Sequence, residues 1–355
     1  MNILLTGGGT GGHVIPNIAL IPYLKRQGAN IYYIGSRDSI EERLISEQNV
    51  PFYPVTTVKL RRDKILGNLT IPHLLLRGIR EAKEVLSTLN IDVVFAKGGY
   101  VSLPAAYAAK SLNIPVICHE SDASLGMANK LISRYARITI TSYENTRVRG
   151  NTKCLGNPIR DSIFDGDASH VIDTLDYDST LPFLLIVGGS QGAQRINNFV
   201  TDNVSALTER YNIIHLTGRN VNKINHSRYN AIEYASNIED YLALADIVVS
   251  RSGANALAEL TALRKKTILI PLETRASRGD QLSNALIAES QHRAIVLREH
   301  DLTLDTFEQT IARVTHMSIP HSDYVNASES IANLIVTTAE EHALLSRMNT
   351  HPAIS

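Results

Sequence analysis

A glycine-rich segment, Thr-Gly-Gly-Gly-Thr-Gly-Gly-His at residues 6–13, directly follows a short apolar run at residues 3–5. Its five glycines in six positions let the backbone turn sharply and bring N–H groups close to a ligand, because no Cβ stands in the way. From residue 14 to residue 27, apolar side chains recur at helical spacing. Strand, glycine loop and helix in this order predict a mononucleotide-binding unit, whose helix N-terminus offers a site for an anion or a polar ligand.

The spacing Gly7-x-Gly9-x-x-Gly12 also matches the dinucleotide-binding fingerprint. That fingerprint needs an acidic residue about 20 residues further on, at the end of the second strand, to hold the ribose hydroxyls. Here the predicted second strand, residues 30–34, ends in Gly-Ser-Arg without a carboxylate. The pattern therefore disfavours NAD, whereas Arg37 could suit the 2′-phosphate of NADP, so an NADP-dependent oxidoreductase stays open.

The same device recurs in the middle of the chain, where the apolar run at residues 184–187 leads into Gly-Gly-Ser-Gln-Gly-Ala at residues 188–193. Further strands and helices alternate regularly, which predicts an α/β fold with two Rossmann-like, doubly wound parallel-sheet domains. The Gly-Asn-Pro-Ile-Arg segment at residues 156–160 is typical of a hinge. The predicted strands are residues 30–34, 52–55, 93–96, 116–118, 138–141, 183–187, 212–216, 231–234, 246–249 and 266–271, and the predicted helices include 14–27, 39–48, 103–112, 238–244 and 327–345.

Composition excludes several classes of protein. The 355 residues suffice for two domains, and the formal net charge of +0 provides no global attraction for nucleic acid. The two cysteines, Cys118 and Cys154, have no metal-ligand spacing, and we expect both to be reduced thiols. No apolar run is long enough to span a bilayer, and the chain begins with a predicted strand, so we expect neither a membrane span nor a signal peptide.

Residues 59–80 carry six Lys or Arg side chains against the single acid Asp63, interleaved with leucine and isoleucine. Such a segment is typical of an interfacial patch for an anionic membrane or a basic mouth for an anionic acceptor. An ordinary loop and helix with a solvated basic face is the alternative. The sequence alone leaves these interpretations open.

A second phosphate-type motif follows the predicted strand at residues 246–249, where Ser252-Gly253-Ala254-Asn255 starts a helix. Free N–H groups and the positive end of the helix dipole would face a phosphate there. Glu259 lies six residues after Gly253, about 9 Å along a helix. This separation suits a carboxylate that holds the ribose hydroxyls of a nucleoside diphosphate.

Taken together, the motifs resemble one family in order and spacing over nearly the whole chain. That family is MurG, the UDP-N-acetylglucosamine:lipid I N-acetylglucosaminyltransferases of peptidoglycan synthesis, which have the GT-B fold. The motifs are residues 8–13, 98–102, 119–120, 156–160, 188–192 and 251–254.

The resemblance implies two Rossmann-like domains with a cleft between them and inverting transfer of N-acetylglucosamine from UDP-N-acetylglucosamine to the C4 hydroxyl of lipid I, which forms lipid II. It implies an N-terminal acceptor and membrane domain at residues 1–160, joined by a returning C-terminal helix at 327–355, and a UDP-sugar domain at 161–326. It also implies a peripheral enzyme at the cytoplasmic face of the cell membrane. The sequence holds no Asp-x-Asp metal motif at a strand end, which agrees with the metal-free, cofactor-free chemistry of the family.

The resemblance also assigns site residues. Glu259 matches the ribose-binding glutamate, Arg160 and the backbone at Tyr234-Ala235 match the uracil pocket, and Thr10 and His13 lie in the acceptor loop. The remaining predicted diphosphate, sugar and acceptor contacts are Gly11, Gly12, Tyr100, His119, Glu120, Asp122, Asn129, Ser190, Gln191, Ser252, Gly253, Ala254, Asn255, Asp280, Gln281 and Asn284. His13 is the candidate base because its unperturbed pKa lies near 6.5, with a substrate-orienting or structural role as the alternative and His119 as the reserve candidate.

The chain departs from the family pattern at two places. His119-Glu120-Ser121-Asp122 stands where many members have His-Glu-Gln-Asn, and Asp280-Gln281 stands where they have Gln-Gln. An ionised carboxylate accepts hydrogen bonds from sugar hydroxyls but cannot donate them. Another GT-B lipid glycosyltransferase with a diacylglycerol acceptor, a sugar-nucleotide epimerase and a non-catalytic sugar-nucleotide sensor therefore remain as alternatives.

Overall fold

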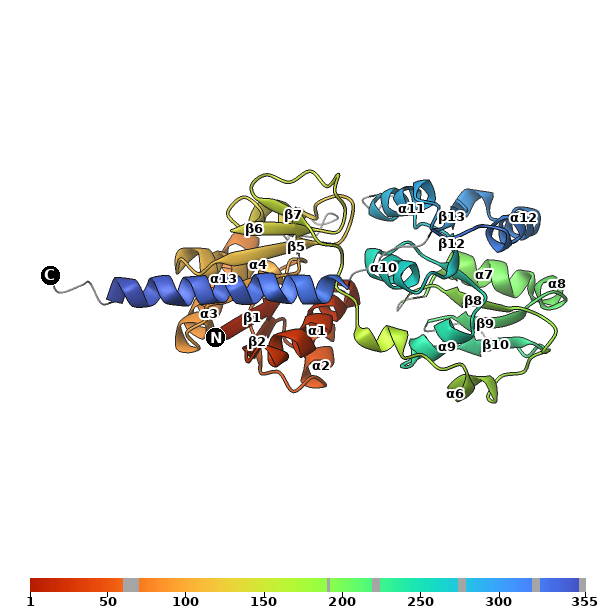
Figure 1. Cartoon of the computed structure of the whole chain (residues 1–355), viewed down its shortest axis with the longest axis horizontal. Helices are drawn as coiled ribbons and strands as arrows, with labels where there is room; N and C mark the ends of the chain where they lie inside the picture. Colours follow the sequence, from red (N-terminus) through yellow and green to blue (C-terminus); the bar gives the residue numbers. More distant parts are fainter. Residues whose placement is uncertain (60–69, 190–191, 219–223, 274–278, 321–325, 351–355) are drawn as a thin grey trace. The chain divides into compact units, whose positions relative to one another are not determined.

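The computed structural model describes residues 1–59, 70–189, 192–218, 224–273, 279–320 and 326–350. The chain divides into two compact units (Figure 1). Unit 1 comprises Met1–Arg160 with Val325–Ser355, and unit 2 comprises Asp161–Tyr324. Each unit is built on one fully parallel sheet, which confirms the predicted α/β class with two doubly wound domains.

The sheet of unit 1 has the strand order β3-β2-β1-β4-β5-β6-β7. The order reverses between β1 and β4, whose carboxyl ends therefore form a topological switch point, the place where ligands of such folds bind. The strands are β1 (Asn2–Thr6), β2 (Asn30–Gly35), β3 (Phe52–Pro54), β4 (Val93–Ala96), β5 (Val116–Glu120), β6 (Ile138–Thr141) and β7 (Thr152–Cys154).

Helices cover both faces of this sheet, and successive strand residues point to opposite faces. In β1, Ile3 and Leu5 pack into the core beneath α1 (Gly11–Arg26), α2 (Ile40–Ser46) and α13 (Ala327–Thr350). Leu4 packs into the opposite core, beneath α3 (Ile71–Thr88), α4 (Ser102–Ser111) and α5 (Met127–Ile132). The long helix α13 packs against α1, so the end of the chain returns to the first domain (Figure 1).

The sheet of unit 2 has the strand order β10-β9-β8-β11-β12-β13, and its switch point lies between β8 and β11. One face packs against α7 (Gln194–Asp202), α8 (Val204–Thr208) and α12 (Leu304–Thr315), and the other against α10 (Ala254–Ala262) and α11 (Asp280–Ser290). The remaining elements are β8 (Phe183–Val187), β9 (Asn212–Leu216), β10 (Tyr229–Ile232), β11 (Ile247–Ser250), β12 (Lys266–Leu269), β13 (Ile295–Val296), α6 (Ser169–Ile172), α9 (Ile238–Leu244), η2 (Asp161–Phe164) and η3 (Glu299–Asp301).

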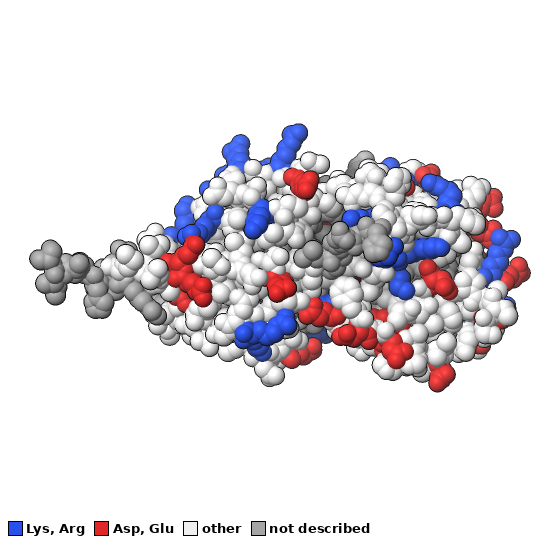
Figure 2. Space-filling model, in the orientation of Figure 1, with Lys and Arg blue, Asp and Glu red and all other residues white. Residues whose placement is uncertain are grey.

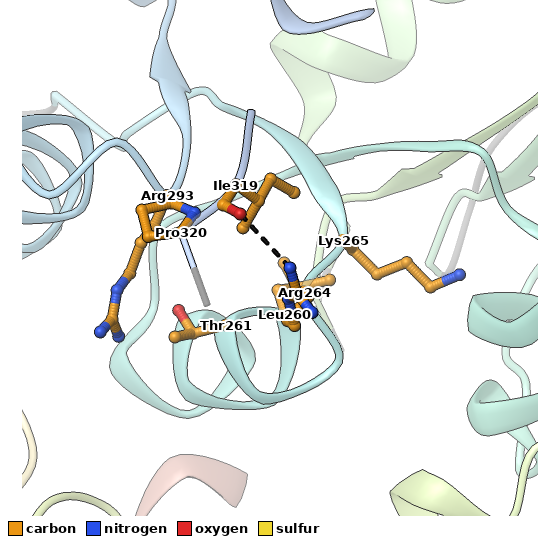
Figure 3. A pocket seen from close by; sticks show the side chains of 7 residues that line it. All are labelled: Leu260, Thr261, Arg264, Lys265, Arg293, Ile319 and Pro320. Atoms are coloured by element: carbon orange, nitrogen blue, oxygen red, sulfur yellow. Dashed lines mark hydrogen bonds between the residues drawn. The ribbon is translucent and has the colours of Figure 1, made fainter. Parts of the chain in front are cut away.

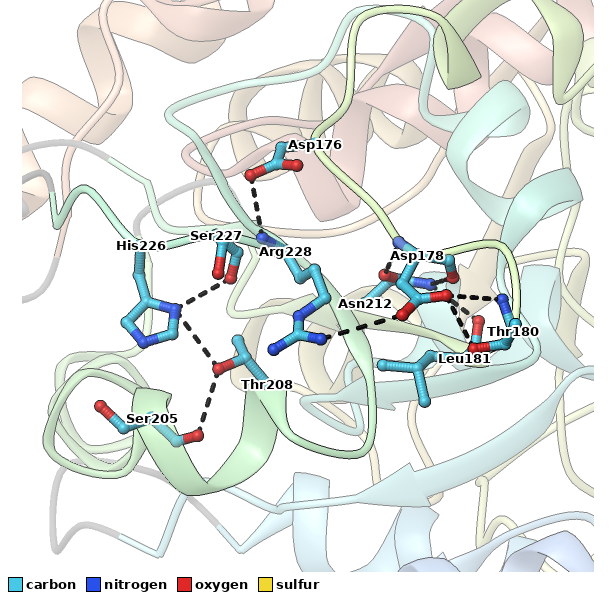
Figure 4. Close-up of polar contacts among 10 residues, drawn as sticks. All are labelled: Asp176, Asp178, Thr180, Leu181, Ser205, Thr208, Asn212, His226, Ser227 and Arg228. Carbon is cyan, nitrogen blue, oxygen red and sulfur yellow. Dashed lines mark hydrogen bonds and ion pairs between the residues drawn. The ribbon is translucent and has the colours of Figure 1, made fainter.

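A network of hydrogen bonds joins the polar segment before β8 to the end of this sheet at which its strands begin (Figure 4). The buried amide of Asn212 donates to the carbonyls of Asp178 and Leu181 at 2.8 and 2.7 Å, and accepts from the Asp178 N–H at 2.8 Å. The N–H of Arg228 donates to the Asp176 carboxylate at 3.2 Å. This network lies at the opposite edge from the glycine loops, so we assign it to the stability of unit 2.

Several boundaries differ from the predictions by a few residues, and three of these differences show how the chain pairs or caps locally. Helix α1 begins at Gly11 rather than residue 14, because Thr10 takes the extended conformation of an N-cap and accepts from the His13 N–H at 3.1 Å. Strand β5 continues through His119 and Glu120, which pair with β6. Strand β10 begins at Tyr229 rather than residue 231, in register with β9.

Charges of both signs are interspersed over the visible face of the molecule, in keeping with the formal net charge of +0 (Figure 2). Among the helices that the structure describes, none is long and apolar enough to cross a membrane.

Candidate functional site

The predicted ligand loops follow the strands at the two switch points. Helices α1, α7 and α10 begin beside these loops, and none of them has an acidic residue in its first turn. In contrast, α9, α11 and α12 each begin with acidic residues. Because the N-terminus of a helix attracts anions, the switch-point helices leave that attraction available to a ligand.

A buried carboxylate lies under the first glycine loop. Glu41, on α2, is fully buried, and it accepts hydrogen bonds from the Gly9 N–H and the Ser36 N–H, both at 3.2 Å. A Cβ on Gly8 would lie 2.5 Å from the carboxyl carbon of Glu41, so only glycine fits there. Glu41 is not among the residues predicted from the sequence, although its position shortly after the second strand was a usable signal.

This arrangement argues against a dinucleotide at the first loop. The Gly9 N–H, which would face a pyrophosphate in a dinucleotide-binding protein, donates instead to Glu41. A pyrophosphate would also meet the negative charge of that carboxylate, which is unfavourable in a buried setting. Burial and the Glu41 charge also raise the pKa of nearby Tyr100, which therefore stays neutral.

The candidate base lies in the first turn of α1. His13 Nδ1 is 3.0 Å from the Thr10 hydroxyl, which connects two of the predicted acceptor-loop residues. The following loop packs directly on the first one, since Gly99, with φ of +76°, approaches the Gly8 carbonyl so closely that no side chain would fit. A Cβ at Gly99 would also lie 3.3 Å from His13 Nδ1. The His13 ring is thus bonded to the Thr10 hydroxyl and lies close to the Gly99 backbone.

The residues at the end of β5 lie mostly inside unit 1. His119 is fully buried, and its Nε2 bonds the Gly156 carbonyl at 3.0 Å. Burial, reinforced by the Lys97 charge, lowers the pKa of His119 well below its usual value. A fully buried imidazole cannot reach an acceptor hydroxyl, so its position argues against His119 as the reserve base.

Glu120 and Asn129 form one buried group beside it. The Glu120 carboxylate accepts from the Asp122 N–H at 3.1 Å, the Gly126 N–H at 2.8 Å and the Asn129 amide at 2.9 Å. Three such bonds fix the loop that carries Asp122, which is itself half-buried. Glu120 and Asn129 therefore shape this loop from beneath, and Asp122 is the residue of the group that faces outward most.

In unit 2 the structure brings three of the predicted residues together. The buried hydroxyl of Ser252 donates to the Gln281 carbonyl at 2.8 Å, and the buried amide of Asn284 donates to the Ser252 carbonyl at 3.3 Å. The Gln281 side chain accepts from the Leu272 N–H at 3.0 Å. The start of α11 is therefore docked against the loop that precedes α10.

Arg251 also stabilises this region, although it is not among the site residues predicted from the sequence. Its guanidinium donates to the carbonyls of Ile270 and Pro271 at 3.0 and 3.2 Å. It also forms a largely buried ion pair with Glu299. Arg251 thus ties the ends of β11 and β12 to the segment after β13, and this holds the Ser252-Gly253 turn in place.

The other predicted residues of unit 2 are distributed around these loops. Glu259 is half-buried on α10, whereas Tyr234 is 71% exposed after β10. Gly253 caps α10, Ala254 and Asn255 form its first turn, and Asp280 is the first residue of α11. In unit 1, Gly11 and Gly12 form the first turn of α1, and Arg160 is half-buried at the end of the unit. Ala235 follows β10 and is half-buried. Ser190, Gln191 and the basic positions 61, 62 and 64 lie outside the described residues.

The pocket drawn in Figure 3 is separate from these loops. It is lined by Leu260, Thr261, Arg264, Lys265, Arg293, Ile319 and Pro320. These residues surround the C-terminal end of α10, opposite to the end that begins at Ala254. Within the part of the chain that the structure describes, no cluster of His, Cys, Asp and Glu could hold a metal ion.

Comparison with protein families matches both units. Residues 3–141 match the glycosyltransferase family 28 N-terminal domain, and residues 183–339 match the family 28 C-terminal domain. A UDP-N-acetylglucosamine–N-acetylmuramyl-(pentapeptide) pyrophosphoryl-undecaprenol N-acetylglucosamine transferase from Lachnoclostridium phytofermentans is 42% identical over 92% of this chain and 94% of its own length. A Clostridium botulinum protein of the same name is 38% identical over 91% and 93%. The chain belongs to this family of N-acetylglucosamine transferases.

Solved structures agree with the predicted GT-B fold. MurG from Acinetobacter baumannii superposes with a TM-score of 0.72 at 23% identity, and the match covers 95% of this chain and 99% of that one. A UDP-GlcNAc 2-epimerase from Neisseria meningitidis, solved with UDP-GlcNAc, gives a TM-score of 0.64 at 13% identity, with coverage of 95% and 100%. At such identities the likeness concerns the fold alone. The epimerase shares this fold.

A buried polar chain supports the second glycine loop of this family member. On β9, His215 Nδ1 lies 3.0 Å from the Tyr229 hydroxyl and His215 Nε2 lies 3.0 Å from the side-chain oxygen of Asn197 on α7. The Asn197 amide donates to the Thr217 carbonyl at 2.8 Å. Gly192 crosses that carbonyl so closely that a Cβ would lie 2.5 Å from it. The loop, α7 and the end of β9 are therefore held through one neutral histidine.

The neutral state of His215 predicts that the free energy of unfolding depends on pH. Burial lowers the pKa of His215 from 6.5 to about 4, so between these values the unfolded state binds the proton more strongly. The stability that His215 contributes is complete above pH 6.5 and falls as the pH drops toward 4, by on the order of 3 kcal/mol. Urea unfolding of the wild type and His215→Gln across this range should show a smaller acid loss in the variant. Parallel pH profiles would contradict the assigned neutral state.

Proposed function

We propose that the chain transfers N-acetylglucosamine from UDP-N-acetylglucosamine to the C4 hydroxyl of lipid I, which forms lipid II for peptidoglycan synthesis. The observation that carries this proposal is the 42% identity to a relative of that name over 92% of the chain. The placement of the family motifs at two switch points supports it. Unit 1 would take the acceptor and unit 2 the sugar nucleotide.

The chemistry follows from the arrangement of each unit. The acceptor hydroxyl oxygen attacks the anomeric carbon, the bond from that carbon to the UDP oxygen breaks, and a base takes the hydroxyl proton. The departing diphosphate carries the developing negative charge. The N-termini of α7 and α10, free of acidic residues in their first turns, would stabilise that charge without a metal.

His13 is the base in this proposal, and Thr10 orients it. If the Thr10 hydroxyl accepts from Nδ1–H, the proton-free lone pair lies on Nε2, which can then take the acceptor proton. The half-buried position of His13 in the first turn of α1 leaves it accessible. Asp122, Tyr100 and the turn Gly11-Gly12 would complete the acceptor site.

Glu259 would hold the ribose of the donor in unit 2. The diphosphate would be contacted by Ser190, Gln191, Ala254 and Asn255. The uracil would be contacted by Arg160 and by the backbone of Tyr234-Ala235. Gln281 and Asp280 would reach the sugar. Asn284 and Ser252 are buried and bonded to each other, so we assign them to holding the α11 start in place.

We also propose that unit 1 binds anionic membrane at the cytoplasmic face. In the described part of the basic segment, Leu76 is 65% exposed on α3, and Lys59 and Arg80 are exposed. Arg77 pairs with Glu81 at 2.8 Å, so part of its charge is offset. Exposed leucine beside exposed basic side chains suits shallow insertion into an anionic surface.

Glu259→Ala should raise the donor KM at least tenfold and leave the turnover number at saturating donor within about threefold. The carboxylate makes hydrogen bonds of about 1.5–3 kcal/mol each to the ribose, alike in the ground and transition states, and such uniform binding appears in KM. Steady-state transfer kinetics and calorimetry with UDP measure both quantities. An unchanged donor KM with a collapsed turnover number would contradict the role, and NADP should give no binding heat.

His13→Ala should lower turnover by roughly 10²–10⁴-fold with UDP affinity unchanged, because the hydroxyl proton loses its acceptor. Thr10→Val keeps the shape of the side chain but removes the hydroxyl, and should give a smaller loss in the same direction. Turnover and its pH profile are the measurements. If His13→Ala retains more than a tenth of wild-type turnover, the base lies elsewhere.

Leu76→Glu should reduce sedimentation with vesicles of phosphatidylglycerol and leave activity on a short-chain soluble acceptor unchanged, because it places an acid in the inserting face. The matched control is Leu344→Glu, which alters a leucine of similar exposure, 60%, on α13. Equal sedimentation of the wild type and Leu76→Glu would make α3 an ordinary solvated helix.

A further inference from the structure

A buried lysine lies beneath the acceptor loops of unit 1. Lys97 follows β4 directly, and its side chain is 1% exposed. Its backbone N–H donates to the Thr6 carbonyl at 2.9 Å, which places it beside the start of the first glycine loop. A lysine is almost never fully buried unless its charge has a partner, so its position requires an explanation.

The Lys97 ammonium begins a directed chain of hydrogen bonds. It donates to the Ser121 hydroxyl, and that hydroxyl donates to the Asn157 side-chain oxygen at 2.9 Å. Ser121 lies between Glu120 and Asp122, whereas Asn157 lies in the segment that ends unit 1 at Arg160. One buried cation therefore connects the loop after β5 to the last segment before unit 2.

The same segment has two further attachments. His119 bonds the Gly156 carbonyl at 3.0 Å, and the buried Ser328 hydroxyl of α13 donates to the Ile159 carbonyl at 3.0 Å. The end of β5, the Ser121 loop and the start of α13 are thus all bonded to this segment. Of these attachments, only the one through Ser121 depends on a charged group.

The charge of Lys97 sets the direction of the chain. An ammonium has three donors and no acceptor, so the Ser121 hydroxyl must accept from it and give its own proton to Asn157. A neutral amine carries a lone pair that competes for the same hydroxyl proton. Loss of the charge would therefore weaken the bond from Ser121 to Asn157.

We propose that Lys97 is a positioning residue for the acceptor, which acts through Ser121 to hold the Asp122 loop and the segment at Asn157 in the arrangement that lipid I binds. The inference rests on the proposed function and adds to it a residue that touches no substrate. It also accounts for Ser121, the position at which this chain departs from the glutamine that many family members carry.

Among the described residues, the titratable groups that act on the Lys97 charge lie on β5 or just after it. Glu120 and Asp122 carry negative charge that favours the ammonium, Cys118 is a buried thiol, and His119 is held neutral. Burial outweighs the two carboxylates and lowers the pKa of Lys97 from 10.5 to about 8. Acceptor binding should therefore weaken as the pH rises past about 8.

The stability of the protein should change with pH in the opposite direction to acceptor affinity. This difference separates a positioning role from a merely structural one. Between pH 8 and 10.5 the unfolded chain binds the lysine proton more strongly than the folded one. The contribution of Lys97 to the free energy of unfolding therefore increases as the pH rises through this range. A structural role alone predicts no loss of acceptor affinity where that contribution grows.

The test compares the wild type, Lys97→Met, Lys97→Arg, Ser121→Ala and the double variant Lys97→Met/Ser121→Ala between pH 6.5 and 9.5. Lys110→Met, which removes an exposed lysine of α4, is the matched control. Acceptor KM, donor KM, turnover and urea unfolding are measured for each protein, with lipid I as the acceptor.

We expect the acceptor KM to rise about tenfold, or ~1.4 kcal/mol, in Lys97→Met and in Ser121→Ala, with donor KM within twofold of wild type. The double variant should be no worse than Lys97→Met, because both changes break one chain. The wild-type acceptor KM should rise above pH 8, whereas Lys97→Met should be flat and Lys97→Arg, which keeps its charge, should restore affinity at high pH.

An unchanged acceptor KM in Lys97→Met, an equal rise in donor KM, or additive effects in the double variant would overturn the inference. If Lys97→Met does not fold, Ser121→Ala and the wild-type pH profile decide the question, since both retain the lysine. Absence of transfer by the wild type and by Lys110→Met would contradict the proposed function itself. Normal transfer with no effect at Lys97 would contradict only this inference.

Discussion

The first glycine loop rests on the buried carboxylate of Glu41, and the acceptor site depends on this contact. The Glu41 carboxylate accepts from the Gly9 N–H in the loop and from the Ser36 N–H, while the backbone N–H of Lys97 donates to the Thr6 carbonyl at the start of the loop. Without a Cβ at Gly8, the loop can rest directly on the carboxylate. Thr10 and His13 follow within five residues of Gly8, so their geometry derives from this contact.

In unit 2, the loops are also held by buried polar groups, but of other kinds. A neutral histidine and an amide support its glycine loop, and the buried pair of Arg251 and Glu299 holds the turn before α10. In both units, buried polar groups that bind no substrate are hydrogen-bonded to the loops or beside them, and this rigidifies the loops before a ligand arrives. The ligand loops lie at the switch points of the two sheets, and these buried groups fix the geometry of the loops.

Much of this fold was predictable from the sequence, because both sheets are covered on each side and their strands are nearly continuous apolar runs. The two glycine motifs indicated the two domains, and the Thr10 and His13 pair was among the predicted residues. The buried residues were harder. Glu41 belongs to a helix whose charged positions are usually solvated, and the bond between Lys97 and Ser121 joins residues 24 positions apart. Such pairings depend on strand order, which periodicity does not reveal.

The most direct test of the account is a transfer assay with radiolabelled UDP-N-acetylglucosamine and two acceptors, lipid I and diacylglycerol, measured side by side on the same protein. The account predicts that label enters lipid I with turnover and that diacylglycerol remains unlabelled. Labelling of diacylglycerol in preference to lipid I would contradict it and assign the chain to another lipid glycosyltransferase. UDP-N-acetylglucosamine binding without transfer to either acceptor would contradict an enzymatic role altogether.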